Sequence, residues 1–356
     1  MDKYKVDFTL LDNKRPIGVT GLMRVKNDGC FVSASIDSCI EALDELVIAY
    51  DDSEDNTVEV IKEKQRQYPD KIRIYHYEPQ IYSHNLVSQD FDEVAGLKED
   101  SVHLLSNYYN WTMSKATYRY AFKIDADQIY FTSKLKYICD LYRSDNNPHI
   151  SISDHAVHLY YRVVCKFFGL FPAALNHYTS IFFINGFVAR KVQNYIYKRI
   201  EKDKIVTSFS GINLFYDNEV CVPMGKFHDG VQPPINGSGD HIFFQPSSKN
   251  KYIPWPQREY NRIIEVMSPA SKMYFGGGFL WLHLNAMRPK IYETNKKKYV
   301  GHTANIEQFI GNNFFQLEGE YGFCISNFMR PIVYQSLLAD KKIIKDYVSK
   351  YKKAYS

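Results

Sequence analysis

Apolar positions in the first third of the chain follow two periods in turn. A largely apolar segment spans residues 17–23, and a set of apolar residues then recurs at i, i+4, i+7, i+8 and i+11. The members of this set are Val32, Ile36, Cys39, Ile40 and Leu43. The first pattern indicates a strand and the second predicts a helix with one buried face. The uninterrupted run Leu46-Val47-Ile48-Ala49 follows, and it is typical of a strand buried on both faces of a parallel sheet.

The same alternation continues to residue 130. Val58 and Ile61 predict a second helix, residues 71–75 a strand, residues 102–115 a third helix and residues 120–124 a fourth strand. Strands and helices in this order predict an α/β fold with a doubly wound, mostly parallel sheet. In such sheets ligands bind beyond the carboxyl ends of the strands. The residues that follow each strand are therefore the first candidates for a site.

Two acidic groups follow predicted strands. Asp51 and Asp52 come after the strand at 46–49, and Asp125 and Asp127 come after the strand at 120–124. Residues i and i+2 of an extended segment point to the same side, so Asp125 and Asp127 are expected to project together. Paired carboxylates suit Mg²⁺ or Mn²⁺, which keep coordination positions for phosphate oxygens. The pattern indicates a nucleoside diphosphate substrate, although Asp-x-Asp is also common as a plain turn.

Three motifs in this region resemble those of a known family. Arg24-Val25-Lys26-Asn27-Asp28 is similar to an opening "R-V-K-N-E" segment, and residues 44–57 are similar, nearly position for position, to "D-E-I-V-V-V-D-D-G-S-T-D-N-T". Asp125-Ala126-Asp127 matches a metal-binding "D-x-D". The chain thus resembles the GT-A nucleotide-sugar glycosyltransferases of the family 2 type over residues 17–130, and more loosely to residue 283. Tyr50 and Asp52 depart from the pattern, so it stays open whether Asp51 or Asp52 meets the base.

The resemblance implies a GT-A fold and transfer of a sugar from a nucleoside diphosphate sugar, expected to be UDP-linked, to an acceptor hydroxyl with inversion. It implies nucleotide-binding roles for Arg24, Lys26, Asp51, Asp52 and Asp125. It also implies that Asp127, with Asp125, holds Mn²⁺ or Mg²⁺, which neutralises the departing diphosphate. His283, after the glycine run at 276–278, is similar to a third metal ligand in some GT-A enzymes; a structural histidine is the alternative.

The acceptor half matches the family more loosely. Asp240, in a glycine-bearing turn before an apolar segment, is the first candidate for the base that removes the acceptor proton, with Asp154 and then Asp229 in reserve. A helix-capping aspartate is the alternative for Asp240. Residues 182–190 resemble the family's acceptor-side segment. The resemblance gives acceptor-side roles to three residues, Asn185, Gly186 and Arg190, and an ordinary buried strand with a turn is the alternative.

Domain boundaries follow from these assignments. Residues 1–288 are expected to form the GT-A domain, with a nucleotide-binding half at about 15–130 and an acceptor half at about 131–288. Residues 289–356 are predicted to be a lysine-rich, mainly helical extension. A modest helical stripe runs along its end, formed by Leu337, Ile344, Val348 and Tyr351.

Basic and apolar segments raise the question of a membrane surface. Lysines cluster at 296–298, 341–342 and 352–353, and they could dock on an anionic membrane that carries a lipid-linked acceptor; a solvated helix is the plainer interpretation. Residues 159–175 are rich in apolar side chains but too short and too charged to span a bilayer. They are expected to form core or a lip over the acceptor. Without a spanning segment or signal peptide, we expect a cytoplasmic protein, and a peripheral position on the inner face of the membrane is the alternative.

Composition excludes several other classes. The chain has 356 residues, 45% hydrophobic content and a net charge of +4, which suits a large domain and does not require nucleic acid as a partner. Its six cysteines show no Cys-x-x-Cys spacing, so neither a zinc site nor a disulfide framework is expected.

Three functions remain at this point. The first is a hexosyl- or N-acetylhexosaminyltransferase that builds a surface glycan such as lipooligosaccharide, capsule or O-antigen. The second is a sugar-phosphate nucleotidyltransferase on a related fold, although only Gly29 lies near the basic segment where that chemistry needs a glycine-rich loop. The third is a catalytically silent protein that binds a nucleotide sugar. The sequence determines neither the donor sugar nor the acceptor, since both depend on the shape of a pocket.

Overall fold

The computed structural model describes residues 3–82, 86, 90–170, 187–224, 234–237, 241–268, 272–311 and 329–355. The chain forms two compact units, each built from segments distant in sequence. Unit 1 comprises Met1–Asp127, Leu135–Arg143 and Asp240–Met273, and unit 2 comprises Gln128–Lys134, Ser144–Gly239 and Tyr274–Ser356. The boundary predicted near residue 288 stays a prediction; residues 274–356 share unit 2 with earlier segments.

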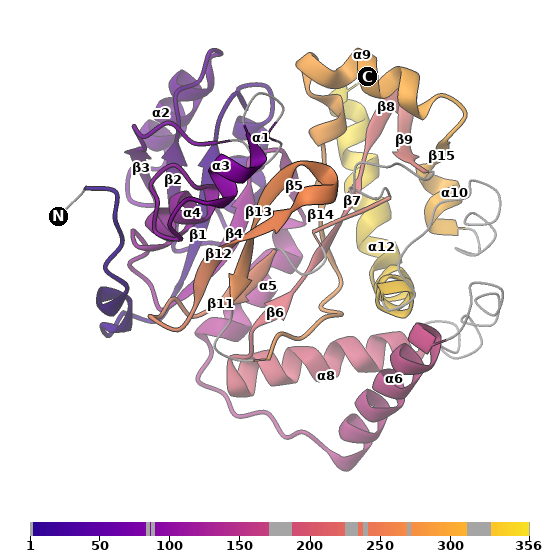
Figure 1. Ribbon diagram of the computed structural model, residues 1–356. Coiled ribbons are helices and arrows are strands. Elements are labelled where there is room, and N and C mark those ends of the chain that lie inside the picture. The colour runs from indigo at the N-terminus through magenta and orange to yellow at the C-terminus, as the bar shows by residue number, and fades with distance from the viewer. Residues whose placement is uncertain are drawn as a thin grey trace. The chain divides into compact units, whose positions relative to one another are not determined.

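Unit 1 is a mostly parallel sheet with helices, as the sequence predicts (Figure 1). Its strands lie in the order β3 (Ile72–His76), β2 (Glu45–Tyr50), β1 (Val19–Val25), β4 (Tyr120–Asp125) and β11 (Ile242–Phe244). The first four strands are parallel, and β11 runs antiparallel to β4. Its helical segments are η1 (Phe8–Asp12), α1 (Val32–Cys39), α2 (Thr57–Gln67), α3 (Phe91–Ala95), α4 (Leu105–Met113) and most of α5 (Thr132–Arg143). This confirms the predicted α/β fold class.

The parallel strands form because their side chains are buried. Almost every residue of β1, β2 and β4 is buried, which explains the continuous apolar runs in the sequence. Phe243 of β11 stacks on Phe122 of β4 with ring centroids 4.1 Å apart, and Tyr142 of α5 stacks on Phe243 at 5.0 Å. These rings join the antiparallel strand to the parallel ones.

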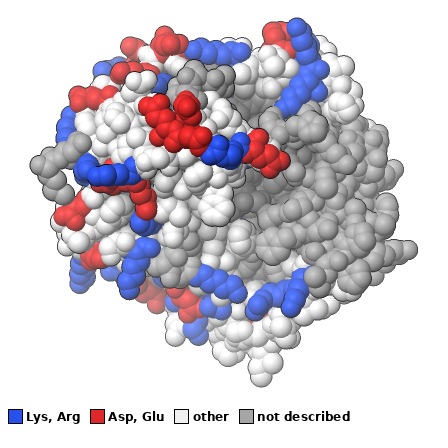
Figure 2. Space-filling view, in the orientation of Figure 1, with Lys and Arg blue, Asp and Glu red and all other residues white. Residues whose placement is uncertain are grey.

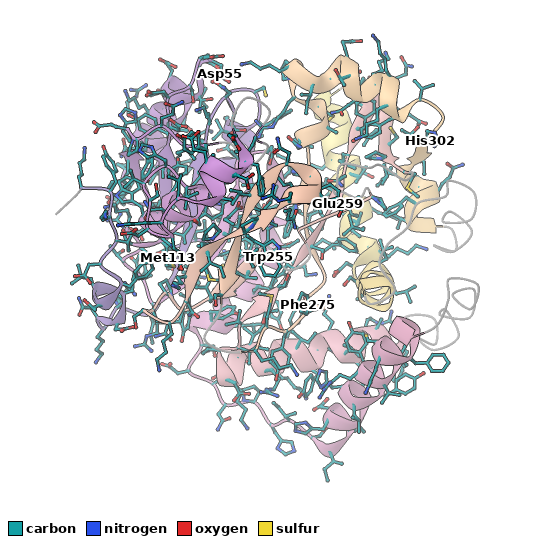
Figure 3. All side chains as sticks on the ribbon, in the orientation of Figure 1. Asp55, Met113, Trp255, Glu259, Phe275 and His302 are labelled. Carbon is teal, nitrogen blue, oxygen red and sulfur yellow. The ribbon has the colours of Figure 1, made fainter. Side chains whose placement is uncertain are left out.

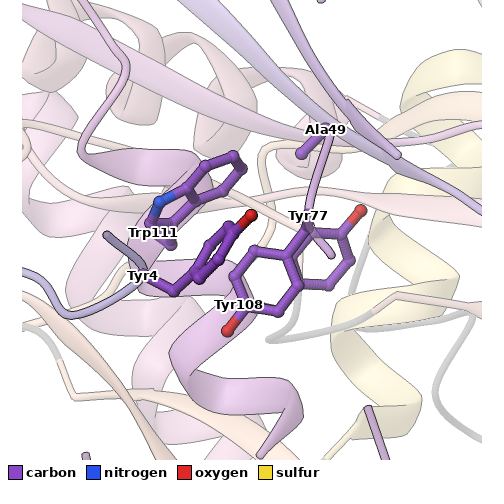
Figure 4. Close-up of a cluster of buried hydrophobic side chains, with 5 residues drawn as sticks. All are labelled: Tyr4, Ala49, Tyr77, Tyr108 and Trp111. Carbon is purple, nitrogen blue, oxygen red and sulfur yellow. The ribbon is translucent and has the colours of Figure 1, made fainter. Parts of the chain in front are cut away.

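An aromatic cluster covers the sheet beside α4. Figure 4 shows its members, which are Tyr4, Ala49, Tyr77, Tyr108 and Trp111. The Tyr77 ring lies 5.0 Å from both the Tyr4 and the Trp111 rings, edge-on in each case. Such pairs add about 0.5–1.5 kcal/mol each to the burial of their surface. Part of the high aromatic content of the chain is therefore structural.

A hairpin absent from the sequence-based prediction completes unit 1. Strands β12 (Lys251–Gln257) and β13 (Arg262–Ser268) pair with each other and pack on α4. The side chain of Asn110 in α4 donates to the Tyr252 carbonyl and accepts from the Tyr252 N–H, both at 2.8 Å. Asn261, in the left-handed region with φ 46°, turns the chain between the strands after η4 (Arg258–Tyr260). Trp255 projects from β12 and is 54% exposed (Figure 3).

Unit 2 contains two smaller sheets, five α-helices and one 3-10 helix among its described residues. One sheet has the order β10 (Ile235–Asn236), β7 (Ser210–Asn213), β14 (Phe279–His283), β5 (Gln128–Tyr130), and the other has the order β15 (Thr303–Asn305), β9 (Glu219–Pro223), β8 (Phe215–Asp217). Its other strand is β6 (Thr207–Ser208). Its helical segments are α6 (Ile152–Leu170), α8 (Phe187–Asp203), η5 (Asn285–Met287), α9 (Pro289–Tyr299), α10 (Ile306–Gly311) and α12 (Met329–Tyr355).

The last helix confirms the predicted stripe. Leu337, Ile344 and Val348 of α12 are all less than 9% exposed, while the Tyr351 side chain lies outside the described residues. Asp340 of the same helix accepts hydrogen bonds from the Lys134 ammonium and the Phe279 N–H, both at 2.7 Å. None of the helices in the described ranges is long and apolar enough to cross a membrane.

The glycine run before β14 packs against this network. Gly278 has φ +103°, and a Cβ there would lie 2.2–2.5 Å from side-chain atoms of Asp340, Gln193 and Lys134. Gln193 also donates to the Gly277 carbonyl at 3.2 Å. A side chain at residue 278 would therefore displace a buried ion pair, which gives this glycine a packing role in addition to the backbone freedom seen in the sequence.

Candidate active site

The carboxyl ends of three parallel strands bring the predicted nucleotide-binding residues together in unit 1. Arg24 of β1 pairs in register with Ala49 of β2 on one side and with Asp125 of β4 on the other. Lys26 and Asp51 follow β1 and β2. Residues from three distant parts of the sequence thus meet at one edge of the sheet, where α/β folds bind ligands.

The two acids after β2 occupy different environments. Asp51 is buried, with 6% exposure, and accepts hydrogen bonds from the Lys26 ammonium at 2.6 Å and from the Asp52 N–H at 2.7 Å. The side chain of Asp52 is 83% exposed and lies 2.9 Å from Nε2 of His76. Lys26 itself is 53% exposed, so it reaches Asp51 from the solvent side.

Polar contacts tie the loop after β1 to the loop after β2. Asn27 takes the left-handed conformation with φ 57°, and its side chain accepts from the Glu54 N–H at 2.8 Å. Asp55, labelled in Figure 3, accepts from the Gly29 N–H at 3.0 Å. The Asp28 N–H donates to the Thr57 hydroxyl at 2.7 Å. These bonds explain the polar residues at both places in the sequence, and they hold the strand-end groups at a fixed separation.

Asp125 lies among three basic side chains. His241 Nε2 is 2.8 Å from its Oδ2, Lys123 Nζ is 3.4 Å from Oδ2, and Arg24 Nη2 is 3.4 Å from Oδ1. Burial alone would raise the pKa of Asp125, but Lys123, His241 and Arg24 outweigh it and hold the pKa well below the usual range. Asp125 is therefore ionised at neutral pH.

Tyr109 of α4 supports the cations from the other side. The Arg24 guanidinium lies 3.4 Å from the centroid of the Tyr109 ring, and the Lys123 ammonium lies 5.5 Å from it. Burial raises the pKa of Tyr109 well above its usual value, so the ring stays neutral beside them. Burial would lower the pKa of Arg24, whereas Tyr109 and Asp125 favour its charged form, and its pKa is raised overall.

Sequence reasoning missed three of these residues. Lys123 lies inside the strand predicted at residues 120–124, and His241 directly follows the base candidate Asp240, so both are neighbours of residues that the sequence did single out. Tyr109 carries no signal, because an aromatic residue on a buried helix is ordinary core. Tyr108 beside it also lies near Asp51 and Arg24, and burial raises its pKa.

Asp127 follows the end of β4 and has 5% exposure. The strand ends at Asp125, and Ala126 and Asp127 form a turn before β5. This corrects the expectation that both acids project from one extended segment, since the alternation of sides holds only within a strand. Both acids supply the oxygen donors that a hard cation prefers. No group of three metal-ligating side chains occurs among the described residues, so a metal role stays a prediction for both.

His283 lies in β14 of unit 2 and is buried, with 9% exposure. It pairs in register with Gln128, the residue after Asp127. Its Nδ1 lies 2.7 Å from Oδ1 of Asn213. A contact of this kind fixes the ring orientation of a metal-ligating histidine and of a structural histidine alike, so its role as a ligand stays a prediction.

Of the candidates for the base and for acceptor binding, the structure describes only two, Asp154 and Arg190. Asp154 accepts from the Lys198 ammonium at 2.7 Å and from the Ser151 N–H at 2.9 Å at the start of α6. The hydrogen bond from Lys198 and then those from Ser151 lower the pKa of Asp154 to about 2, so it is a weak base at neutral pH. Arg190 is exposed in the first turn of α8. The other candidates lie outside the described residues: Asp240, Asp229, Asn185 and Gly186.

Comparison with known proteins gives one sequence match. Residues 2–170 match the family model of the β-1,4-N-acetylgalactosaminyltransferases (CgtA). No curated protein matches the sequence.

Among solved structures, one similar chain is glucosyl-3-phosphoglycerate synthase from Mycobacterium tuberculosis, in complex with Mn²⁺, UDP and phosphoglyceric acid. It shows 14% identity over 34% of this chain and 36% of its own, with a TM-score of 0.20, so the match spans about a third of the synthase. Residues 1–349 of TarS from S. aureus show 9% identity over 96% of this chain and 92% of their own, with a TM-score of 0.29. A structure of the same TarS fragment in complex with UDP has a TM-score of 0.28. Likeness at this level assigns no residue or substrate here.

The match of residues 2–170 to a glycosyltransferase family therefore agrees with the parallel sheet and with the basic and acidic residues at its carboxyl edge. Residues 2–170, slightly less than half of the chain, are thus similar to a glycosyltransferase family.

Proposed function

We propose that the protein transfers a hexose or an N-acetylhexosamine from a UDP-sugar to a hydroxyl group of a surface glycan such as lipooligosaccharide, capsule or O-antigen. The transfer inverts the anomeric carbon and depends on Mn²⁺ or Mg²⁺. The observation that carries the proposal is the pairing of Lys26 with Asp51 and of Arg24 with Asp125 at the edge of the sheet. The matching family acts with N-acetylgalactosamine, so UDP-N-acetylgalactosamine is the first donor to test.

The environments of Asp51 and Asp52 indicate different roles in nucleotide binding. Asp51 pairs with Lys26 and can accept a hydrogen bond from the uracil imide or from a ribose hydroxyl. Because its cationic partner is exposed, a ligand can displace Lys26 without leaving it buried and unpaired. The side chain of Asp52 is 83% exposed and holds no such enclosed position. We therefore assign the nucleoside contact to Asp51.

The diphosphate needs positive charge, which Arg24 and Lys26 supply from β1 and the loop after it. Asp127, with Asp125, would hold the divalent cation, which supplies Lewis-acid stabilisation of the departing diphosphate when bound. His283 stays a predicted metal ligand. Asp240 would take the acceptor proton, since the ion pair with Lys198 leaves the reserve candidate Asp154 a weak base. Asn185, Gly186 and Arg190 stay assigned to the acceptor side.

A donor screen with a matched pair of variants tests this proposal. UDP-, GDP-, CMP- and dTDP-sugars are incubated with Mn²⁺ or Mg²⁺, hydrolysis and transfer are measured, and the anomeric configuration of the product is determined by NMR. We expect Asp127→Ala to lose at least a hundredfold in transfer rate with an unchanged thermal midpoint. Asp100→Ala removes an exposed acid elsewhere in unit 1 and should behave like the wild type.

Each alternative function predicts a different result in the same screen. A nucleotidyltransferase would release pyrophosphate from a nucleoside triphosphate and a sugar 1-phosphate. A silent binding protein would show a thermal shift with UDP and Mn²⁺ but consume no donor. Retention of anomeric configuration would contradict the proposed mechanism even with the right donor.

A further inference from the structure

Helix α6 of unit 2 exposes a stripe of large apolar side chains. Its residues Ile152, Leu159, Tyr160, Val163 and Phe167 are 90%, 61%, 40%, 58% and 42% exposed, respectively. With Ala156, also exposed, they recur at i, i+4, i+7, i+8, i+11 and i+15, which is one face of a helix. The interpretation of residues 159–175 as core is therefore wrong for this stripe, while residues 171–175 lie outside the described part.

The opposite face of α6 is the one that packs. Tyr161, Val164 and Cys165 are at most 7% exposed, and the helix contacts α8 and α12 (Figure 1). Lys198 of α8 fixes its amino-terminal end through Asp154. One apolar face of the helix thus packs on the protein, and a second apolar face is exposed to solvent. This is unusual, because a surface helix normally has a single apolar face.

Charges beside the stripe are basic. Arg162 and Lys166 are exposed and flank it on one side. Asp154 is the one acidic residue of α6, and the ion pair with Lys198 leaves it only 12% exposed. At the lower edge of the view, Figure 2 shows Lys and Arg side chains next to uncharged surface. The exposed side of α6 therefore combines apolar surface with net positive charge.

We infer that this face of α6 docks on an anionic lipid bilayer, with the helix lying in the plane of the interface. The apolar stripe would enter the boundary between headgroups and acyl chains, while Arg162 and Lys166 would bind lipid phosphates. A second copy of the chain fits less well, because a two-fold contact through the same face brings Arg162 and Lys166 of both copies together without an acidic partner on that face. The surface would hold the enzyme beside acceptors carried on lipids.

Vesicle binding tests the inference with matched variants. Leu159→Glu and Leu10→Glu replace leucines that are 61% and 60% exposed, in α6 and in η1 of unit 1. The wild type and Leu10→Glu should sediment with phosphatidylglycerol vesicles at low salt, and Leu159→Glu should lose at least tenfold in the bound-to-free ratio. Arg162→Gln with Lys166→Gln should weaken binding and reduce its salt dependence. Phosphatidylcholine vesicles should bind the wild type weakly.

Several outcomes would overturn the inference. The inference fails if the wild type stays in the supernatant with anionic vesicles. It also fails if Leu159→Glu binds as well as Leu10→Glu, which would place any contact elsewhere, such as on the carboxyl-terminal lysines. A dimer in size-exclusion chromatography that Leu159→Glu dissociates, without vesicle binding by the wild type, would assign the face to a second copy. Circular dichroism and the thermal midpoint show that each variant is folded. The assay needs no donor, so its result is independent of the proposed function.

Discussion

The acids at the ends of β2 and β4 are similar in sequence but differ in their surroundings. Asp51 has one cationic partner, Lys26, whose side chain is 53% exposed. Asp125 has three basic neighbours. Two of them, Arg24 and Lys123, have side chains that are only 7% and 2% exposed, respectively. An exposed cation can return to water when a ligand takes its place, whereas a buried one cannot. Asp51 is thus suited to exchange its partner for a ligand, and Asp125 also holds the structure of the edge together.

The largest expected effect tests the structural half of this comparison. Asp125→Ala leaves Arg24 and Lys123 buried without their carboxylate, and we expect a loss of about 3–5 kcal/mol in the free energy of unfolding. Urea denaturation measures it. Asp51→Ala is the control, with an expected loss of only about 1 kcal/mol, because Lys26 stays solvated. Equal losses in the two variants would mean that the two strand ends do not differ in this way.

A ligand-binding measurement tests the other half. Asp51→Asn keeps the size of the side chain but removes the charge, and a hydrogen bond to a charged group contributes about 1.5–3 kcal/mol. We expect UDP affinity to fall by about tenfold to a hundredfold, measured by calorimetric titration, with little change in thermal stability. The control is Asp52→Asn, at the neighbouring exposed position, which should bind UDP like the wild type.

Acid should remove the contribution of Asp125 to stability. Its pKa is held well below the usual range in the folded protein, so the contribution is fully present above the unfolded pKa of about 3.9 and is lost as the pH falls towards the folded value. We expect the difference in unfolding free energy between the wild type and Asp125→Asn to shrink from pH 6 to pH 3. Urea titrations at both values measure it, and a difference that grows in acid would contradict the assignment.

The smallest expected effect concerns Lys26. Lys26→Met removes an ion pair that is open to solvent, so the free energy of unfolding should change by less than about 1 kcal/mol. UDP binding should weaken and lose part of its dependence on salt concentration, because one positive charge near the diphosphate is gone. A stability loss as large as that of Asp125→Ala would show that Lys26 is structural too.

Most of unit 1 could be predicted from local sequence. The strands at β1 to β4 and helices α1, α2 and α4 lie where the apolar periods place them, because burial on one or both faces leaves a pattern that repeats every two or 3.6 residues. The strand-end positions of Arg24, Asp51 and Asp125 follow from the same reasoning, since parallel strands end at one edge. The β12–β13 hairpin escaped prediction because its prolines and exposed Trp255 interrupt the expected alternation.

What the sequence alone determined is therefore the parallel sheet and the residues at its carboxyl edge, since both depend on order along the chain. Tertiary structure decided which cations surround Asp125. Arg24, Tyr109 and His241 reach this carboxylate or its neighbours from β1, from α4 and from the residue before β11, and no period links those positions. It also decided which apolar face of α6 is buried: both faces are apolar in the sequence, and only packing against α8 and α12 distinguishes them.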